Sequence, residues 1–88
     1  MTQEQIHNAV LAFLRTNIIY DEKRVILDDD SFLATGILDS TGILELIGYL
    51  ESEYGVRFHD DELVADNFDS LARITRFMSE KLAKSQKA

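Results

Sequence analysis

The chain has 88 residues, of which 45% are hydrophobic, and this is enough for one domain, 1–88, with a packed core. Its 16 acidic and 9 basic residues give a formal net charge of −7, which disfavours nucleic acid and anionic membranes and favours partners with basic surfaces. The absence of cysteine excludes disulfides and cysteine ligands, and the absence of proline favours uninterrupted helices.

The N-terminal residues predict a helix and no targeting segment. "MTQEQIHNAV" lacks the basic start and long apolar run of a signal peptide, and no stretch of the chain is long and apolar enough to span a membrane. We therefore expect a cytoplasmic protein without a membrane segment.

Thr2 and Gln5 have the spacing of a capping box. They predict an amphipathic helix from about Gln3 to about Thr16, whose apolar face consists of Ile6, Val10, Phe13 and Leu14.

Residues 17–39 show no sustained hydrophobic period but hold many apolar side chains. We expect a long loop that these side chains pin to the core, with a short helical turn at about Ser31–Ala34. The segment "RVIL" could be read as a short strand. Because no second convincing strand is available to pair with it, no sheet is expected.

The second helix is the most clearly marked element. Ser40 is a favourable N-cap residue, and Gly55, followed by the apolar Val56, is a favourable stop signal. At 100° per residue, four apolar side chains fall within about 60° of Ile43 on the helix circumference and predict, with it, a core stripe. The stripe consists of Ile43, Leu46, Ile47, Leu50 and Tyr54.

Residues 56–68 predict a second loop. Within it, "HDDELV" predicts one helical turn, capped by His59 or Asp60, with Leu63 and Val64 tucked into the core.

A last helix follows, with Asp66, Asn67 or Asp69 as its cap. Its apolar stripe consists of Leu71, Ile74, Phe77, Met78 and Leu82. The tail, from about residue 83 to 88, is expected to fray. The elements together predict an all-α fold, a small bundle of three main helices plus one short helix, with a long loop between the first and second helices.

The face of the second helix opposite the core stripe has an unusual composition. It carries Thr41, Leu44, Glu45, Gly48, Glu51 and Ser52. A leucine beside a flat glycine, rimmed by carboxylates, is typical of a docking surface for a basic partner. The alternative is an ordinary surface, since single exposed leucines are common and a glycine can let a loop pack closely.

Ser40, within "GILDSTGILEL", is the main candidate for chemistry. Its ordinary interpretation is a helix cap. A catalytic serine needs a base, and the two histidines, His7 and His59, lie far from it in sequence. A small hydrolase would require the second loop to bring His59 to Ser40.

Metal and phosphate sites are not expected. "DDD" at Asp28–Asp30 begins like a calcium loop, but Phe32 stands where the third oxygen ligand belongs. The four side chains of "HDDE" at His59–Glu62 are sequence neighbours, which point apart on a helix and cannot all converge on one ion. No glycine-rich phosphate loop is present.

The segment "ATGILDSTGILELIGYLESEYGVRF", residues 34–58, resembles the acyl carrier protein family, the phosphopantetheine-binding carriers. The resemblance rests on "LDS" at the start of the second helix, then "LEL", then the acidic and aromatic "LESEYG". Further matches are Phe58, Asp60, Glu62 and Leu63, and the segment "NFDSLARI". It covers most of the chain, and the acidic charge and the helix and loop layout agree with it.

The resemblance implies that a separate phosphopantetheinyl transferase, using Mg²⁺ and coenzyme A, attaches 4′-phosphopantetheine to Ser40, next to Asp39. The arm ends in a thiol that carries an acyl or aminoacyl group as a thioester. The protein would then be a carrier rather than an enzyme. The resemblance also makes the second helix the partner-recognition helix, with Leu44, Glu45 and Glu51 on its docking face.

The chain departs from the family pattern at three glycine or threonine positions. Thr41 and Gly42 stand where many members have a large apolar and an acidic residue, and Gly48 where a larger apolar residue is common. The departures favour partners other than those of general fatty acid synthesis. "GILDSTGILEL" resembles stand-alone carriers that work with dedicated adenylating ligases, including aminoacyl carriers.

The expected partners of such a carrier are the transferase, an acyl- or aminoacyl-activating ligase and a downstream synthase or transferase, with the carrier itself a monomer. The alternative is an unmodified interaction module that binds partners through the acidic face of the second helix.

Overall fold

The computed structural model describes residues 2–19 and 23–86, and within these ranges the regular structure is entirely helical. Three long helices form the frame: α1 (Gln3–Asn17), α3 (Ser40–Tyr54) and α5 (Leu71–Gln86). Between them lie the one-turn helices α2 (Phe32–Thr35) and α4 (Ala65–Phe68) and the 3-10 helix η1 (Asp60–Glu62). The predicted all-α fold with three main helices is confirmed, and "RVIL" is irregular rather than a strand.

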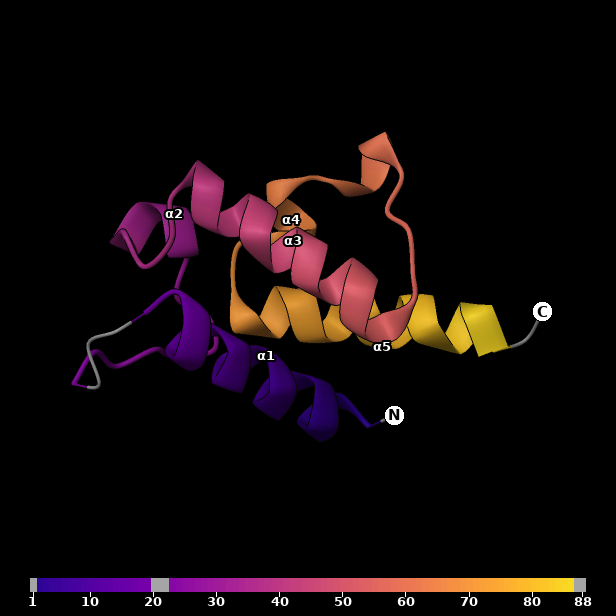
Figure 1. The fold of residues 1–88 in the computed structure, drawn as a ribbon, viewed down its shortest axis with the longest axis horizontal. Coiled ribbons are helices and arrows are strands. Elements are labelled where there is room, and N and C mark those ends of the chain that lie inside the picture. Colours follow the sequence, from indigo (N-terminus) through magenta and orange to yellow (C-terminus); the bar gives the residue numbers. More distant parts are fainter. Residues whose placement is uncertain (1, 20–22, 87–88) are drawn as a thin grey trace.

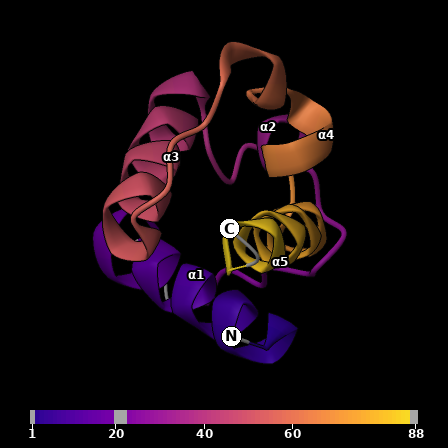
Figure 2. The ribbon, with the colours of Figure 1, turned by 90° about the vertical axis from the view of Figure 1, so that its right-hand side faces the viewer.

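The three long helices enclose a common core. In Figure 1, α1 runs from right to left, whereas α3 and α5 run from left to right, so α1 is antiparallel to both. Figure 2 looks along α5 and shows α1, α3 and α4 placed around it. No helix in the described part of the chain is long and apolar enough to cross a membrane.

The predicted apolar stripes supply most of the core. The fully buried side chains of the long helices are Ile6, Val10, Leu14, Leu46, Leu50, Leu71, Ile74 and Met78. The short helices α2 and α4 add Phe32 and Phe68, and the loops add Ile19, Ile37 and Leu38. Ile43, Ile47 and Tyr54 are only partly buried and pack against this cluster. Phe13 stacks on Tyr49 with ring centres 4.1 Å apart, which joins α1 to α3.

The ends of the long helices differ slightly from prediction. The capping box of α1 is confirmed, because Thr2 Oγ1 accepts the N–H of Gln5 at 3.1 Å and the Gln5 side chain accepts the N–H of Thr2 at 3.0 Å. The helix ends at Asn17, one residue later than expected. The helix α5 ends at Gln86, residues 87–88 lie outside the described ranges, and the fraying expected from about residue 83 stays a prediction.

The start of α5 lies later than its predicted caps. Asp66 and Asn67 belong to the additional helix α4, and Asp69 faces the interior. The cap is Ser70, whose hydroxyl oxygen accepts a hydrogen bond from the N–H of Arg73 at 3.1 Å. The sequence offered four cap-type residues in five positions, and tertiary contacts of Asp69 decided among them.

Asp69 fastens α2 to the rest of the molecule. It is 9% exposed, and its carboxylate accepts hydrogen bonds from the hydroxyl of Ser31 and, at 3.0 Å, from the N–H of Leu33. Its backbone carbonyl accepts the first N–H of α2 at 2.9 Å. Ser31 also caps α2 by accepting the N–H of Ala34 at 3.1 Å. The predicted helical turn is confirmed, and Asp69 fixes the segment that leads into α3.

His7 ties α1 to the long loop. Its Nε2 lies 2.7 Å from Oδ1 of Asp28, and the backbone carbonyl of Asp28 accepts the N–H of Ala72 at 3.0 Å. The hydrogen bond with the Asp28 carboxylate is the main cause that raises the pKa of His7 above its ordinary value, and a hydrogen bond with Asn8 adds to it. The acidic "DDD" segment is thus a structural contact between three parts of the chain.

The pKa of His7 predicts a pH dependence of stability. Because the folded state raises this pKa, the protonated histidine stabilises the fold at pH values below its unfolded pKa of about 6.5, and this contribution is lost as pH rises through the folded pKa. We expect the urea-derived free energy of unfolding to fall as pH rises from about 6 through the raised pKa of His7. The fall should be smaller in Asp28→Asn. His59→Gln is the control and should keep the wild-type difference; equal pH profiles for wild type and Asp28→Asn would contradict the prediction.

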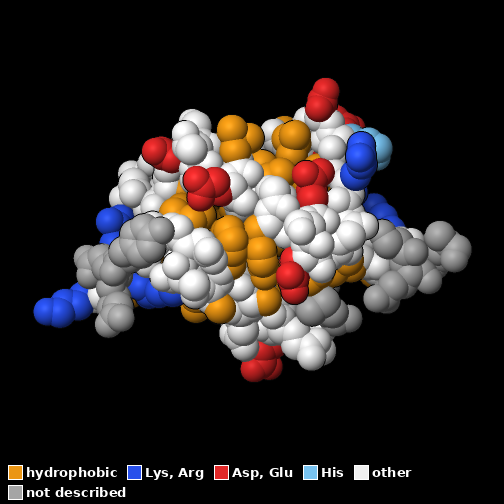
Figure 3. All heavy atoms as spheres, viewed as in Figure 1, with side chains coloured by type: hydrophobic (Ala, Val, Ile, Leu, Met, Phe, Trp, Pro, Cys, Tyr) orange, Lys and Arg blue, Asp and Glu red, His pale blue; other side chains and the backbone are white. Residues whose placement is uncertain are grey.

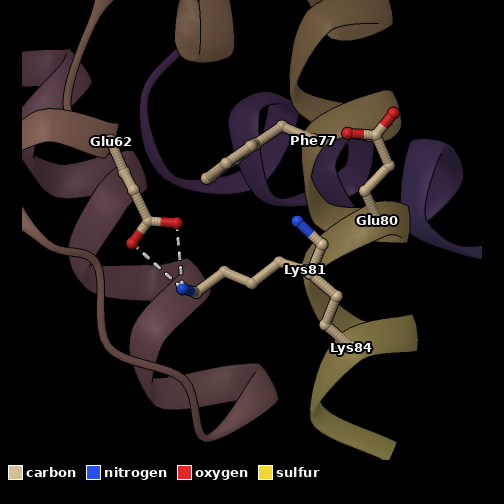
Figure 4. A pocket seen from close by; sticks show the side chains of 5 residues that line it. All are labelled: Glu62, Phe77, Glu80, Lys81 and Lys84. Atoms are coloured by element: carbon tan, nitrogen blue, oxygen red, sulfur yellow. Dashed lines mark hydrogen bonds and ion pairs between the residues drawn. The ribbon is translucent and has the colours of Figure 1, made fainter. Parts of the chain in front are cut away.

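The connection from α3 to α4 is fastened to α5 by a partly buried ion pair, seen in Figure 4. Lys81 Nζ donates to both carboxylate oxygens of Glu62, at 3.0 and 3.1 Å, and lies 5.5 Å from the ring centre of Phe58. The Glu62 carboxylate also accepts the N–H of His59 at 2.8 Å. This backbone hydrogen bond, helped by Lys81, holds the pKa of Glu62 below its ordinary value. His59 is the N-cap residue of η1, one of the two predicted for that turn.

Candidate functional site

The start of α3 separates two roles that the sequence analysis gave to one residue. Asp39, not Ser40, is the N-cap, because Oδ1 of Asp39 accepts the N–H of Gly42 at 2.8 Å. Ser40 is the first residue of the helix and is exposed. Within the described ranges no hydrogen bond engages its hydroxyl. Capping by Ser40 is therefore a wrong prediction, and its hydroxyl is left available for chemistry.

The stop of α3 agrees with prediction. Gly55 has a positive φ of 64°, a left-handed conformation that glycine adopts without a steric penalty. The N–H of Val56 then returns to the carbonyl of Glu51 at 3.3 Å. The helix therefore runs between Asp39 and Gly55 over the length that the sequence indicated.

Gly42 has a packing role that sequence reasoning missed. It is buried in the first turn of α3, and a Cβ built on it would lie 3.2 and 3.3 Å from two side-chain carbons of Leu38. These distances are tighter than most Cβ contacts, so Leu38 would have to shift. Leu38 is 3% exposed and immediately precedes Asp39. Glycine at position 42 thus lets Leu38 anchor the segment that presents Ser40.

An apolar hollow of about 300 Å³ lies beside Ser40. It is lined by Leu33, Ser40, Ile43, Leu44, Ile47 and Leu63. Leu33 of α2 is 50% exposed, and Leu63, after η1, is 41% exposed. Figure 3 shows apolar side chains at the surface along the upper edge, where α3 begins and the α3–α4 connection passes.

The burial predicted for Leu63 and Val64 is wrong, since they are 41% and 45% exposed. The ion pair of the preceding Glu62 with Lys81 fixes the turn instead, so the apolar residues after it remain at the surface. Leu33 was among the apolar side chains expected to pin the long loop to the core, and this prediction is wrong, since Leu33 is 50% exposed.

The predicted docking face is exposed over most of its length. Thr41, Leu44, Glu45, Gly48 and Ser52 are all exposed, and Leu44 reaches 67%. Glu51 differs: it is half-buried, and its Oε2 accepts the N–H of Phe58 at 3.2 Å. Its carboxylate therefore holds the second loop as well as edging this face.

Gly48 has no packing reason to be glycine. A Cβ at this position would meet nothing within 4 Å, so the interpretation that it lets a loop pack closely is wrong. Glycine in a helix interior costs about 1 kcal/mol relative to alanine. Its position on the exposed face beside Leu44 leaves the helix backbone open to an approaching molecule.

Gly48→Ala is expected to stabilise the protein by about 1 kcal/mol, because helix propensity improves and no contact is strained. Calorimetry should show a rise in Tm of roughly 4–8 °C for a chain of this size. Gly42→Ala is the matched control and should lower Tm, since its Cβ presses on Leu38. Equal shifts of the two variants would contradict the different surroundings assigned to the two glycines.

The arrangement provides no base or metal centre at Ser40. The residues that line its hollow include neither histidine nor carboxylate, and His7 is paired with Asp28. Among the residues that the structure describes, no three potential ligands are grouped to hold a metal ion. In the described part of the chain, the exposed Ser40 hydroxyl therefore has no histidine or carboxylate among the residues lining its hollow that could act as a base.

Comparison with known proteins agrees with this geometry. The family model described as "phosphopantetheine attachment site" matches residues 5–78, which include α1, the whole of α3 and most of α5. A comparison with curated proteins gave no match. Because the family model covers well over half of the 88 residues, the chain belongs to the phosphopantetheine attachment site family, the carriers that include the acyl carrier proteins.

Proposed function

We propose that Ser40 bears the arm, and that the protein carries an acyl or aminoacyl group as a thioester from an activating ligase to a downstream synthase or transferase. Members of this family hold 4′-phosphopantetheine covalently. They are substrates of transferases and synthases rather than enzymes themselves. The proposal concerns the residue, the cargo and the order of delivery.

The observation that carries the proposal is the free hydroxyl of Ser40 at the first position of α3. Because Asp39 supplies the cap, Ser40 can be modified without loss of a structural hydrogen bond. The start of a 15-residue helix also suits a phosphodiester, since the partial positive charge of the helix N-terminus favours an anion. The residues present thus fit the group.

In the attachment reaction, the transferase rather than the carrier supplies the general base. The Ser40 oxygen forms a bond to the phosphorus that bears the pantetheine, the pyrophosphate bond of coenzyme A breaks, and adenosine 3′,5′-bisphosphate leaves. The serine proton passes to a base of the transferase, which explains why none is needed beside Ser40. When bound, the arm supplies the thiol, and the chain offers no cysteine to compete for the cargo.

The test is an intact-mass measurement. The apo-protein is incubated with coenzyme A, Mg²⁺ and a broad-specificity phosphopantetheinyl transferase, and the expected result is a gain of one phosphopantetheine on the peptide that contains Ser40. Attachment elsewhere, or no gain with several transferases, would favour the unmodified interaction module. Thioester loading by candidate ligases would then identify the cargo.

The docking face is proposed to recognise these partners through Thr41, Leu44, Glu45, Gly48 and Glu51. Leucine gives an apolar contact and the carboxylates attract basic side chains. Glu45 is the better charge to test, because Glu51 also holds the N–H of Phe58. A dedicated ligase, a monomeric carrier and a cytoplasmic location remain predictions from the sequence.

Glu45→Lys is expected to slow arm attachment by roughly tenfold at low ionic strength, with a smaller effect at high salt. The Tm should stay within a few degrees of wild type, since Glu45 is exposed. Glu53→Lys, a charge reversal at the exposed penultimate residue of α3, is the matched control. If both reversals leave the rate unchanged, Glu45 does not contribute to docking.

A further inference from the structure

A polar hollow of about 270 Å³ lies between the start of α1, the long loop and α5, and none of the residues that line it belongs to α3. Figure 2 shows α1 and α5 side by side. The lining residues of the hollow are Gln3, Glu4, His7, Asp28, Ala72 and Thr75. The hollow is therefore distinct from the docking face of α3 and from the surroundings of Ser40.

Thr75 is the unusual residue of this lining. It is 7% exposed, and its Oγ1 has no hydrogen-bond partner within the described part of the chain. A buried hydroxyl without a partner lowers stability, because its hydrogen bonds to water are lost without replacement. Threonine in a helix adopts two χ1 rotamers, so its hydroxyl and its methyl group can exchange places at the floor of the hollow. Thr75 therefore offers a hydrogen-bond acceptor to a group bound there.

Two carboxylates give the hollow a negative charge. Glu4 is exposed in the first turn of α1 and takes part in none of the ion pairs found among the described residues. Asp28 uses Oδ1 for its 2.7 Å contact with His7, which leaves Oδ2 as a further acceptor, and its side chain is 64% exposed. The pKa of His7 is raised mainly by its hydrogen bond with Asp28, and the charge of Glu4 adds to the rise. Both carboxylates therefore act at the same hollow.

We propose that this hollow receives the guanidinium group of an arginine side chain of a partner protein. A guanidinium carries a permanent positive charge and five N–H donors in one plane. The hollow offers acceptors from three separate segments: Glu4 from α1, Asp28 from the long loop and Thr75 from α5. The bound group then meets carboxylates that complement its charge, and it pairs the hydroxyl that has no partner among the described residues. The proposal does not depend on modification of Ser40.

Other cations fit the hollow less well. Among the residues that the structure describes, no three potential ligands are grouped to hold a metal ion, whereas the donors of a guanidinium point in several directions and reach acceptors that lie further apart. A free small cation is disfavoured, because a few contacts at an open surface do not offset the freedom lost on binding. As one contact of a larger protein interface, the same group adds affinity and fixes orientation.

The test is an NMR titration of the ¹⁵N-labelled apo-protein with a capped tripeptide that has arginine at its centre. We expect saturable shifts of the backbone signals of Gln3, Ala72 and Thr75, with a dissociation constant of roughly millimolar size. The same peptide with citrulline, which keeps the shape of arginine without its charge, should give no such shifts, and a lysine peptide should bind more weakly. Equal shifts with the citrulline peptide, equal binding of the lysine peptide, or shifts confined to α3 would overturn the inference.

Thr75→Val separates binding from stability. Removal of the unpartnered hydroxyl should raise the Tm of the apo-protein by a few degrees, whereas the affinity for the arginine peptide should fall roughly three- to tenfold. Thr35→Val is the matched control, because Thr35 Oγ1 already donates to the carbonyl of Ser31 at 2.6 Å. It should not raise the Tm, and it should bind the peptide like wild type.

Glu4→Gln should also weaken binding of the arginine peptide roughly three- to tenfold, and Glu80→Gln, an exposed position of α5 outside this hollow, should leave it unchanged. Equal binding by these two variants would show that Glu4 does not hold the guanidinium. A Thr75→Val variant that fails to raise the Tm or to weaken binding would show that the hydroxyl has a partner of its own, and the inference would be wrong.

Discussion

Ser40→Ala is expected to abolish arm attachment while leaving the fold intact. The exposed Ser40 hydroxyl makes no hydrogen bond within the described ranges, so its removal should change the free energy of unfolding by no more than about 0.5 kcal/mol. The chemistry needs this oxygen, and mass spectrometry should therefore show no phosphopantetheine after complete conversion of the wild type. Urea unfolding measured on the same apo samples supplies the stability.

Asp39→Ala is the control, because it should lower the stability and retain arm attachment, whereas Ser40→Ala should do the reverse. It removes the acceptor of the Gly42 N–H and should cost about 1 kcal/mol, the ordinary value of an N-cap. The Ser40 oxygen is retained, so attachment should persist at a lower rate. A Ser40→Ala variant that loses as much stability as Asp39→Ala would show that the two roles are not separated as described.

Asp69→Ala is expected to be the most destabilising single change considered. The carboxylate is the acceptor for Ser31 and for the N–H of Leu33, and each donor left without a partner costs about 1–3 kcal/mol. We expect a loss of roughly 2–4 kcal/mol in urea unfolding, a large share of the stability of a chain of this length. Because α2 precedes α3, arm attachment should also slow.

Asp66→Ala is the matched control for this change. Asp66 is also an aspartate near the start of α5, but its side chain is 92% exposed and its contact with Arg73 is 3.7 Å long. Such a pair contributes at most about 1 kcal/mol and commonly much less. Equal losses for the two variants would contradict the role of Asp69 as the fastening of α2.

The long helices could be read from the sequence because their signals are local. The capping box at Thr2 and Gln5 and the stop at Gly55 depend only on residues within a few positions. The stripe of α3 follows from the helical period, and its members Leu46 and Leu50 are fully buried. Charge and the absence of cysteine likewise required no coordinates.

The caps of α3 and α5 could not be assigned from the sequence, because neighbouring residues had equal local preference. Asp39 and Ser40 are both favourable N-cap types, and the choice set whether the serine was free. At the start of α5, Asp69 was a good candidate, but its carboxylate is used by α2 instead. Because Asp39 and not Ser40 is the cap of α3, the Ser40 hydroxyl is free of the capping hydrogen bond that the sequence had predicted for it.

The exposure of Leu33 and Leu63 also could not be predicted from the sequence. Leu63 looked like a core residue because it is apolar and adjoins a predicted turn, yet the ion pair of Glu62 with Lys81, 19 positions apart, fixes that turn with Leu63 at the surface. Leu33, in α2, was expected to help pin its segment to the core, and that segment has no period from which an exposed face could be assigned. Non-local contacts of this kind have no pattern along the chain.

The sequence by itself determined the helical class, the three long helices, the acidic surface and Ser40 as the candidate for modification. These depend on composition, short-range periodicity and adjacent motif residues. Only the tertiary structure decided that Asp39 caps α3, that Gly42 makes room for Leu38 while Gly48 faces open space, and that three leucines surround Ser40. The reason is physical: each of these depends on which distant groups compete for the same hydrogen bond or the same space.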